Sequence, residues 1–197
     1  MKCQHVAIVF GLVFCARVTS AQIDLKVEPN HSTVGFSVPI AGLTKVTGKF
    51  TAFSVAITYD EKDFTRSAVL CSIKVSSIDT GIDDRDKDLQ GEEFFKAVEH
   101  PYIVFKSKRI EKNDASFAAI GDLTMLGVIR EIALPFFISE SKMDDGRKIL
   151  GISAQTKINR LDFGVGTNWK HTLIPNFIGH EVTIEIDMWT RPPKKSD

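Results

Sequence analysis

Apolar residues recur at every second position over most of the chain, and short turn signals separate these stretches. A period of two residues is typical of strands with one buried and one solvated face. With further strands expected within residues 44–59, 102–110 and 116–125, the pattern predicts eight or nine strands. The clearest alternating sets are Val34 to Val38, Val69 to Val75, Ile132 to Ile138, Leu150 to Ile158 and Val182 to Met188.

Turn sequences between these stretches predict how the strands pair. Lys112-Asn113-Asp114 and Asp144-Asp145-Gly146 are typical of hairpins, so neighbouring strands should be antiparallel. An open sheet of that many long strands would expose its edges and one apolar face. An up-and-down barrel avoids both problems. The sequence therefore predicts an all-β fold, an eight-stranded antiparallel barrel.

One segment, Asp83 to Ala97, interrupts the strand pattern. Several aspartates precede Leu89, and Glu92-Glu93 precede the pair Phe94-Phe95. Acidic residues before an apolar stretch favour the first turn of a helix. We expect one or two short helices here, closing one end of the barrel with the Phe pair pointing inward.

The N-terminus has the features of a secretory signal peptide. Lys2 precedes an apolar run at residues 6–15, and Thr19-Ser20-Ala21 offers small residues for cleavage near Ala21. The run is about half as long as the roughly 20 residues of a membrane-spanning helix, so no stable span is expected. Lipidation at Cys15 is the alternative, which the bulky Phe14 disfavours. This predicts a signal peptide at 1–21, one domain at 22–191 and a short basic tail at 192–197.

Composition narrows the function. The chain has 25 basic and 25 acidic residues, and loss of Lys2 and Arg17 with the signal leaves a slight acidic excess. Binding to nucleic acid is therefore not expected, because it requires clustered positive charge. Cys71 would be the single remaining cysteine, which excludes an intramolecular disulfide. Its position between Val69 and Ile73 predicts a buried, unreactive thiol.

The sequence has no pattern that marks a catalytic or cofactor site. It lacks the glycine-rich phosphate and dinucleotide motifs and the nucleophile elbow of the hydrolases. The histidines beyond the signal segment lack the spacing of metal ligands, which must converge in threes or fours. We therefore expect no cofactor, no metal and no catalytic residue. These histidines are His31, His100, His171 and His180.

Four motifs, taken together, resemble those of the YceI-like family of lipocalin-like, lipid-binding barrels. They are Gly48-Lys49-Phe50, the stretch from Ser77 to Phe105, Gly121 to Val128 and Ile158 to Gly164. The resemblance covers nearly the whole mature chain, although Asp88 stands where the family often has histidine. It implies a periplasmic or secreted bacterial protein whose lumen holds the isoprenoid chain of a quinone or a polyprenyl phosphate.

The apolar residues suit such a lumen. The chain has 14 Phe against two Tyr and two Trp, so most aromatic surface carries no polar group. Periodicity alone favours the alternative, a filled barrel that acts through its outer surface, as a protein-interaction or stress-related envelope protein, and the family resemblance shifts the preference to an open lumen. The candidate ligand-binding residues are Phe36, Val38, Phe50, Ile73, Val75, Phe94, Phe95, Phe105, Leu123, Met125, Phe136, Ile152, Phe163, Trp169 and Ile184.

Four charged residues, Arg85, Asp86, Arg160 and Asp162, flank apolar runs and are expected at the rim of the barrel. An Arg there offers planar donors to a phosphate or a quinone oxygen. The favoured interpretation is that the two Arg-Asp sets pair with each other and fasten the helical segment to the rim. A third hypothesis makes them catalytic, in an enzyme acting on an isoprenoid lipid. The sequence leaves the assembly open, a homodimer included.

Overall fold

The computed structural model describes residues 22–191, so the predicted signal peptide and basic tail lie outside the described residues. One short α-helix, α1 (Asp83–Gln90), accompanies the strands. The strands are β1 (Gln22–Val27), β2 (Thr33–Ile40), β3 (Thr44–Phe50), β4 (Phe53–Asp60), β5 (Ala68–Lys74), β6 (Ile78–Asp79), β7 (Tyr102–Asn113), β8 (Ser116–Met125), β9 (Val128–Lys142), β10 (Lys148–Asn159) and β11 (Glu181–Arg191). Four 3-10 helices connect them: η1 (Pro29–His31), η2 (Phe64–Arg66), η3 (Val75–Ser77) and η4 (Arg160–Phe163).

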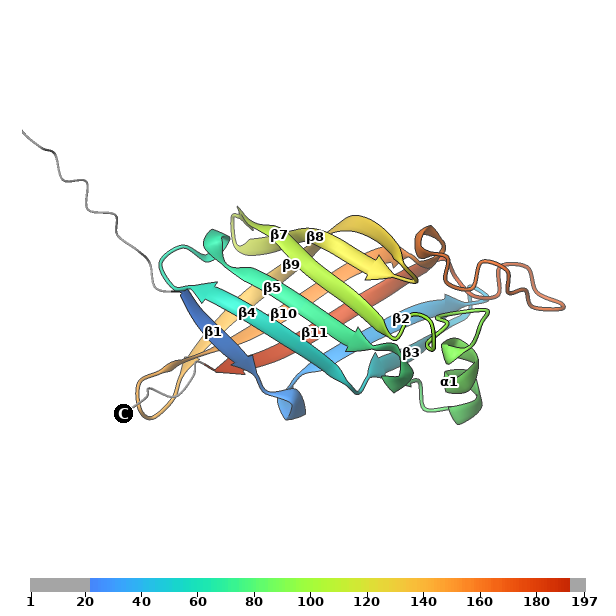
Figure 1. Ribbon diagram of the computed structural model, residues 1–197, viewed down its shortest axis with the longest axis horizontal. Coiled ribbons are helices and arrows are strands. Elements are labelled where there is room, and N and C mark those ends of the chain that lie inside the picture. The colour runs from blue at the N-terminus through green and yellow to red at the C-terminus, as the bar shows by residue number, and fades with distance from the viewer. Residues whose placement is uncertain (1–21, 192–197) are drawn as a thin grey trace, which may run out of the picture.

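The strands form a closed antiparallel barrel of eight strand positions (Figure 1). Three positions consist of two strands with a bend between them: β1 with β2, β3 with β4, and β5 with β6. Thus β11 pairs with β2 through Ile184 and Phe36, and its far end pairs with β1 through Thr190 and Val27. The predicted eight-stranded barrel is confirmed, and the bends explain why more than eight strands are distinguished along the chain.

Helix α1 lies at one end of the barrel, beside the loop of residues 164–180 (Figure 1). Asp83, Asp84 and Asp86 occupy its first turn, and the N–H of Gly91 closes its last turn on the carbonyl of Asp88. The residues that follow continue as turns, so the segment contains one α-helix. This confirms a short helical insertion at one end of the barrel.

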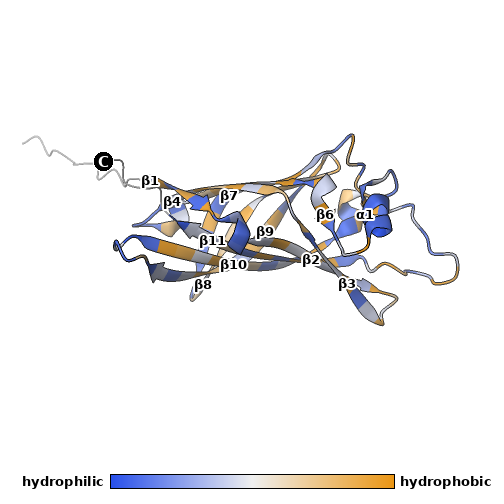
Figure 2. Ribbon diagram, turned by 90° about the horizontal axis from the view of Figure 1, so that it is seen from below, coloured by the Kyte–Doolittle hydropathy of each residue, from blue (hydrophilic) through white to orange (hydrophobic). Residues whose placement is uncertain are grey.

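Aromatic side chains fill the opposite end. Phe64, on η2, packs against Tyr59, Phe117 and Phe136, with ring centroids 5.5, 4.9 and 5.9 Å away. Figure 2 shows how orange apolar and blue polar residues alternate along the strands between the two ends. The inward positions therefore form one continuous apolar interior. The aromatic cluster around Phe64 closes this interior at the end opposite α1.

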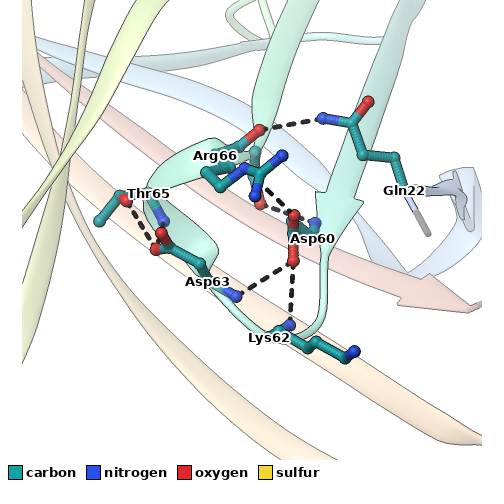
Figure 3. A network of polar contacts seen from close by, with 7 residues as sticks. Gln22, Asp60, Lys62, Asp63, Thr65 and Arg66 are labelled. Carbon is teal, nitrogen blue, oxygen red and sulfur yellow. Dashed lines mark hydrogen bonds and ion pairs between the residues drawn. The ribbon is translucent and has the colours of Figure 1, made fainter. Parts of the chain in front are cut away.

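A buried carboxylate holds the loop that carries Phe64 (Figure 3). Asp60 is 0 % exposed, and its Oδ1 accepts hydrogen bonds from the backbone N–H groups of Lys62 and Asp63 at 3.0 and 3.1 Å. The N–H of Asp60 donates to Ser67 Oγ at 3.0 Å, and Arg66 Nε lies 3.6 Å from Asp60 Oδ2. These contacts fix both ends of the β4–β5 connection.

Replacing Asp60 with Ala should lower the free energy of unfolding by about 2–4 kcal/mol. The change leaves two partly buried N–H groups, those of Lys62 and Asp63, without their acceptor, at a cost of up to about 1–3 kcal/mol for each. Urea denaturation measures the effect. Asp24→Ala is the matched control, because Asp24 accepts one exposed hydrogen bond from Thr58 and its loss should cost under about 0.5 kcal/mol. Equal effects in the two variants would contradict this role of Asp60.

Candidate functional site: the barrel lumen

A cavity of about 560 Å³ runs through the interior of the barrel. Its walls extend from Phe64 and Ser67 at the aromatic end to Leu89 and Trp169 at the end that carries α1. Nearly all of the lining side chains are hydrocarbon. The polar side chains among the described lining residues are Ser67, Arg85, Asp88, Thr156 and Arg160. The lumen is therefore a long, apolar channel with its charged residues near the α1 end, which is called the mouth below.

Inward-facing side chains retain solvent access, as expected of an open lumen. Phe36, Val38, Ile132, Ile184 and Ile186 line the cavity, yet each is only half-buried. In a barrel packed solid with side chains these central positions would be fully buried, because protein interiors pack as densely as organic crystals. The filled-barrel alternative is thus wrong for this chain.

The structure brings most of the candidate lumen residues to the cavity wall. Val75 and Phe163 are the exceptions, because they are buried at 1 % and 2 % exposure without lining the cavity. Both lie in 3-10 helices, η3 and η4, where the two-residue alternation of the preceding strand no longer applies. The residues at the wall are Phe36, Val38, Phe50, Ile73, Phe94, Phe95, Phe105, Leu123, Met125, Phe136, Ile152, Trp169 and Ile184.

Further lining residues were not among the sequence candidates. Ile132, Leu134 and Ile186 belong to alternating sets on β9 and β11, so the periodicity that predicted those strands also contained this signal. Phe177 and Ile178 lie in the loop before β11, where the sequence has no periodicity. A backbone bridge between Ile40 and Ile178 brings that loop against the end of β2.

Arg160 is buried in the wall near the mouth and binds backbone carbonyls. Its Nη1 donates to Val165 O at 2.6 Å and to Gly166 O at 3.1 Å. Its Nη2 donates to Ile178 O at 3.1 Å and its Nε to Gly179 O at 2.9 Å. Burial lowers the pKa of this guanidinium. Arg160 therefore fastens both ends of the loop of residues 164–180, called the mouth loop below. Its donors are used there, so it has little capacity left for a ligand.

Arg85 and Asp86 both bind Thr80, just before α1. Arg85 Nε donates to Thr80 Oγ1 at 2.8 Å and Nη2 to Thr80 O at 2.9 Å. Asp86 Oδ1 accepts from the Thr80 N–H at 3.0 Å and from its hydroxyl at 2.5 Å. Arg85 also lines the cavity, and its Nη1 makes no hydrogen bond within residues 22–191. One guanidinium nitrogen thus remains available at the mouth.

The favoured pairing of the rim charges is wrong. Among the ion pairs of residues 22–191, none joins Arg85 or Arg160 to Asp86 or Asp162. Asp162 is exposed and contributes its backbone carbonyl to Arg130 Nε. Backbone carbonyls and a threonine take the place of the expected carboxylates: Arg160 binds loop carbonyls, and Arg85 binds the hydroxyl and carbonyl of Thr80.

Two further features bear on the chemistry of the site. Within residues 22–191, no three or more His, Cys, Asp or Glu side chains converge as a metal site requires. Nor does any helix in this part of the chain have the length and apolarity to cross a bilayer.

The Cys71 thiol lies in the lumen wall and should react slowly. Desolvation by burial raises its pKa to about 11, from a usual value of 9.0. At pH 8 the thiolate fraction should be about 100-fold below that of a free cysteine, because the pKa is about two units higher. The reaction should be slower by the same factor, because the thiolate is the nucleophile. Stopped-flow reaction with a disulfide reagent measures this, with the urea-unfolded protein as the control. Equal rates in the two states would contradict it.

The same shift affects stability at high pH. The folded pKa lies above the unfolded one, so the folded state keeps its proton longer as the pH rises. The contribution of Cys71 is therefore fully present below about pH 9 and is lost between about pH 9 and pH 11. Cys71→Val should flatten this part of the stability profile.

Comparison with known proteins identifies the family. A family model described as the YceI-like domain matches residues 25–189. The chain belongs to the YceI-like family. The protein YceI of Escherichia coli O6:H1 is 30% identical over 165 residues, covering 80% of this chain and 86% of that protein. A UPF0312 protein of Serratia proteamaculans is 30% identical over 167 residues, covering 81% of this chain and 87% of that protein.

Solved structures have the same fold. The Campylobacter jejuni YceI protein superposes with a TM-score of 0.69 at 29% identity, covering 77% of this chain and 88% of that chain. Burkholderia cenocepacia BcnA gives 0.74 at 23% identity, covering 83% and 99%. A Saccharophagus degradans domain described as polyisoprenoid binding gives 0.62 at 12% identity, covering 87% and 99%. The last two comparisons support the fold alone.

Proposed function

We propose that this YceI-like protein is a non-enzymatic binding protein that sequesters or carries an amphiphilic lipid with an isoprenoid tail. The observation that carries the proposal is the open, apolar lumen of about 560 Å³. This volume lies within the range of about 300–1,000 Å³ that small-molecule sites occupy. The ligand would be quinone-like or a polyprenyl phosphate, held after export to the periplasm or beyond.

The shape of the lumen favours a slender tail. Its walls reach along the barrel from Phe64 to Trp169, and its charged members are confined to the mouth. Each buried methylene contributes about 0.8 kcal/mol, so a few isoprene units would provide affinity without any charged contact. The Saccharophagus degradans domain of the same fold is described as polyisoprenoid binding, which agrees with this ligand class.

The head group would lie at the mouth, close to Arg85. Nη1 of Arg85 has no hydrogen bond within the described chain, whereas Arg160 uses its donors on the mouth loop. A charge-assisted hydrogen bond from Arg85 would stabilise a phosphate more than a neutral quinone oxygen. Binding and release, without turnover, is the function that this arrangement supports best.

Native mass spectrometry with lipid extraction tests the proposal, on protein purified without detergent from its own cell envelope. We expect a stoichiometric lipid with an isoprenoid tail, and a loss of thermal stability when that lipid is extracted. N-terminal sequencing of the same sample tests cleavage near Ala21. Protein that is free of lipid and also fails to bind added ubiquinone and undecaprenyl phosphate would contradict the proposal.

A matched variant tests the head-group contact. Arg85→Gln should weaken binding of undecaprenyl phosphate about tenfold and leave ubiquinone binding nearly unchanged, because only the phosphate needs the positive charge. Arg130→Gln is the control, since Arg130 is exposed and outside the cavity. A tenfold loss for both ligands with Arg85→Gln would place the effect in the helix rather than in the head-group contact.

A further inference from the structure

Two chain segments at the mouth form a surface that the lumen does not explain. They are the β2–β3 turn with the first two residues of β3, residues 41–45, and the loop of residues 167–177, together called the lip below. The Ala41 N–H donates to Phe177 O at 2.7 Å, and the Gly179 N–H donates to Pro39 O at 2.8 Å. These bonds join the two segments, so the lip is one surface. Figure 1 shows it at the end of the barrel that carries α1.

Large apolar side chains protrude from the lip into solvent. Leu43 is 89 % exposed, Leu173 is 84 % exposed and Ile174 is 40 % exposed. Inner residues of the same loop, Trp169 and Phe177, line the cavity. The lip therefore extends the apolar surface of the lumen outward, to the tips of the loops around its opening.

The loop that presents Leu173 and Ile174 is held in place. Nδ1 of His171 accepts hydrogen bonds from the backbone N–H groups of both residues, each at 3.1 Å. The His171 ring stacks on Phe177 with a centroid distance of 4.3 Å and an interplanar angle of 15°. The two apolar tips are thus pre-organised outward, which lowers the entropic cost of binding a surface.

Charge divides the mouth into two sides. Residues 39–48 and 164–180 contain Lys45 and Lys170 and no acidic residue. Neither lysine makes an ion pair within residues 22–191, and both are exposed. The helical side, residues 81–100, is rich in Asp and Glu, and its exposed Val98 adjoins Glu99. The apolar tips therefore stand on the basic side of the mouth.

We propose that the lip docks on the surface of a phospholipid bilayer that contains anionic lipid. Leu43, Leu173 and Ile174 would enter the interfacial region, and Lys45 and Lys170 would face lipid phosphates. Proteins anchored at a membrane interface insert apolar side chains at the level of the lipid head groups, and nearby lysines are attracted to anionic lipid. The docking does not require a particular ligand; it deepens the proposed function by placing the mouth at the membrane.

Vesicle flotation tests the docking, with full-length protein and vesicles of phosphatidylethanolamine and phosphatidylglycerol at 3:1. The double variant Leu173→Ser/Ile174→Ser should bind at least tenfold more weakly than the wild type. Lys45→Gln/Lys170→Gln should lose about fivefold per lysine at low salt, since each lysine near an anionic surface contributes about 1 kcal/mol. The comparison between variants is decisive because residues 1–21 contribute equally to all of them.

Two controls separate the lip from apolar surface in general. Phe137→Ser removes a side chain that is 60 % exposed on β9, and Val98→Ser removes one on the acidic side of the mouth. Both should bind vesicles like the wild type. A loss with Val98→Ser as large as that of the loop variant would overturn the assignment to the basic side.

The outcomes distinguish membrane docking from other uses of the lip. Wild-type protein that ignores the vesicles, or a loop variant that binds them equally well, would overturn the proposal. Self-association of the wild type that the loop variant abolishes, without vesicle binding, would make the lip a protein contact and overturn it too. Native mass spectrometry of the loop variant reports lumen loading separately, so a failure of docking is distinguishable from a failure of the proposed lipid binding.

Discussion

Replacing Arg160 with Met should lower the free energy of unfolding by about 3–5 kcal/mol and release the mouth loop. The substitution keeps most of the apolar stem but removes every donor that now holds Val165, Gly166, Ile178 and Gly179. Each buried carbonyl left without a partner costs about 1–3 kcal/mol, and partial hydration near the mouth offsets part of the sum. Guanidinium chloride denaturation measures the change.

Arg160→Lys separates the charge from the geometry of the guanidinium. A lysine keeps the positive charge but has one nitrogen, which cannot reach carbonyls on both sides of a loop. We expect Arg160→Lys to be nearly as destabilising as Arg160→Met. Arg130→Met is the control, because Arg130 makes one exposed contact of 3.4 Å and should cost under about 0.5 kcal/mol.

Hydrogen exchange locates the effect within the molecule. Protection of the Gly179 and Ala41 amides should fall in the Arg160 variants, because these amides join the loop to β2. Protection at the Phe64 end should persist. A uniform loss of protection over the whole barrel would contradict a local role for Arg160 at the mouth.

The barrel was predictable because its strands repeat one simple pattern. The range predicted for β8, residues 116–125, agrees with the observed bounds, and the turn predicted at Asp144-Asp145-Gly146 separates β9 from β10. The turn predicted at Lys112-Asn113-Asp114 is displaced, because Lys112 and Asn113 still belong to β7 and the turn occupies residues 114–115. Alternation fails where a strand becomes a 3-10 helix. Val75 continues the period of β5 in sequence, yet it belongs to η3 and is buried in the core without lining the lumen.

The mouth was less predictable because its contacts are long-range and involve backbone. Nothing in the sequence indicates that the carbonyls of Val165 and Ile178 converge on Arg160. Every residue has a backbone carbonyl, and an apolar side chain does not show where that carbonyl points. The positions of the Arg and Asp residues beside apolar runs suggested carboxylate partners for the arginines, and the structure supplies carbonyls and Thr80 instead. The sequence also could not predict that the lumen is open, because filled and open barrels show the same alternation of apolar and polar residues.

Filling the lumen from within should abolish lipid binding while the barrel remains folded. Ala154 lies on β10, opposite Phe136 on β9 and Ile186 on β11, and it lines the cavity. An indole at this position in Ala154→Trp would occupy space that a ligand tail needs. Displacing about four methylenes at about 0.8 kcal/mol each would weaken binding more than 100-fold. Quenching of tryptophan fluorescence by ubiquinone, calibrated for Trp189 and for the added indole, measures affinity.

The neighbouring residue provides the control, because adjacent residues of a strand face opposite sides of the sheet. Gln155 points outward, where its Nε2 donates to Glu185 at 3.1 Å, so Gln155→Trp should bind lipid like the wild type. Ala154→Trp should unfold within about 1 kcal/mol of the wild type, since the indole enters existing space rather than a packed core. If it misfolds, the smaller Ala154→Leu repeats the test. A folded Ala154→Trp with wild-type affinity would place the lipid outside the lumen, because tail and indole cannot occupy the same part of one channel.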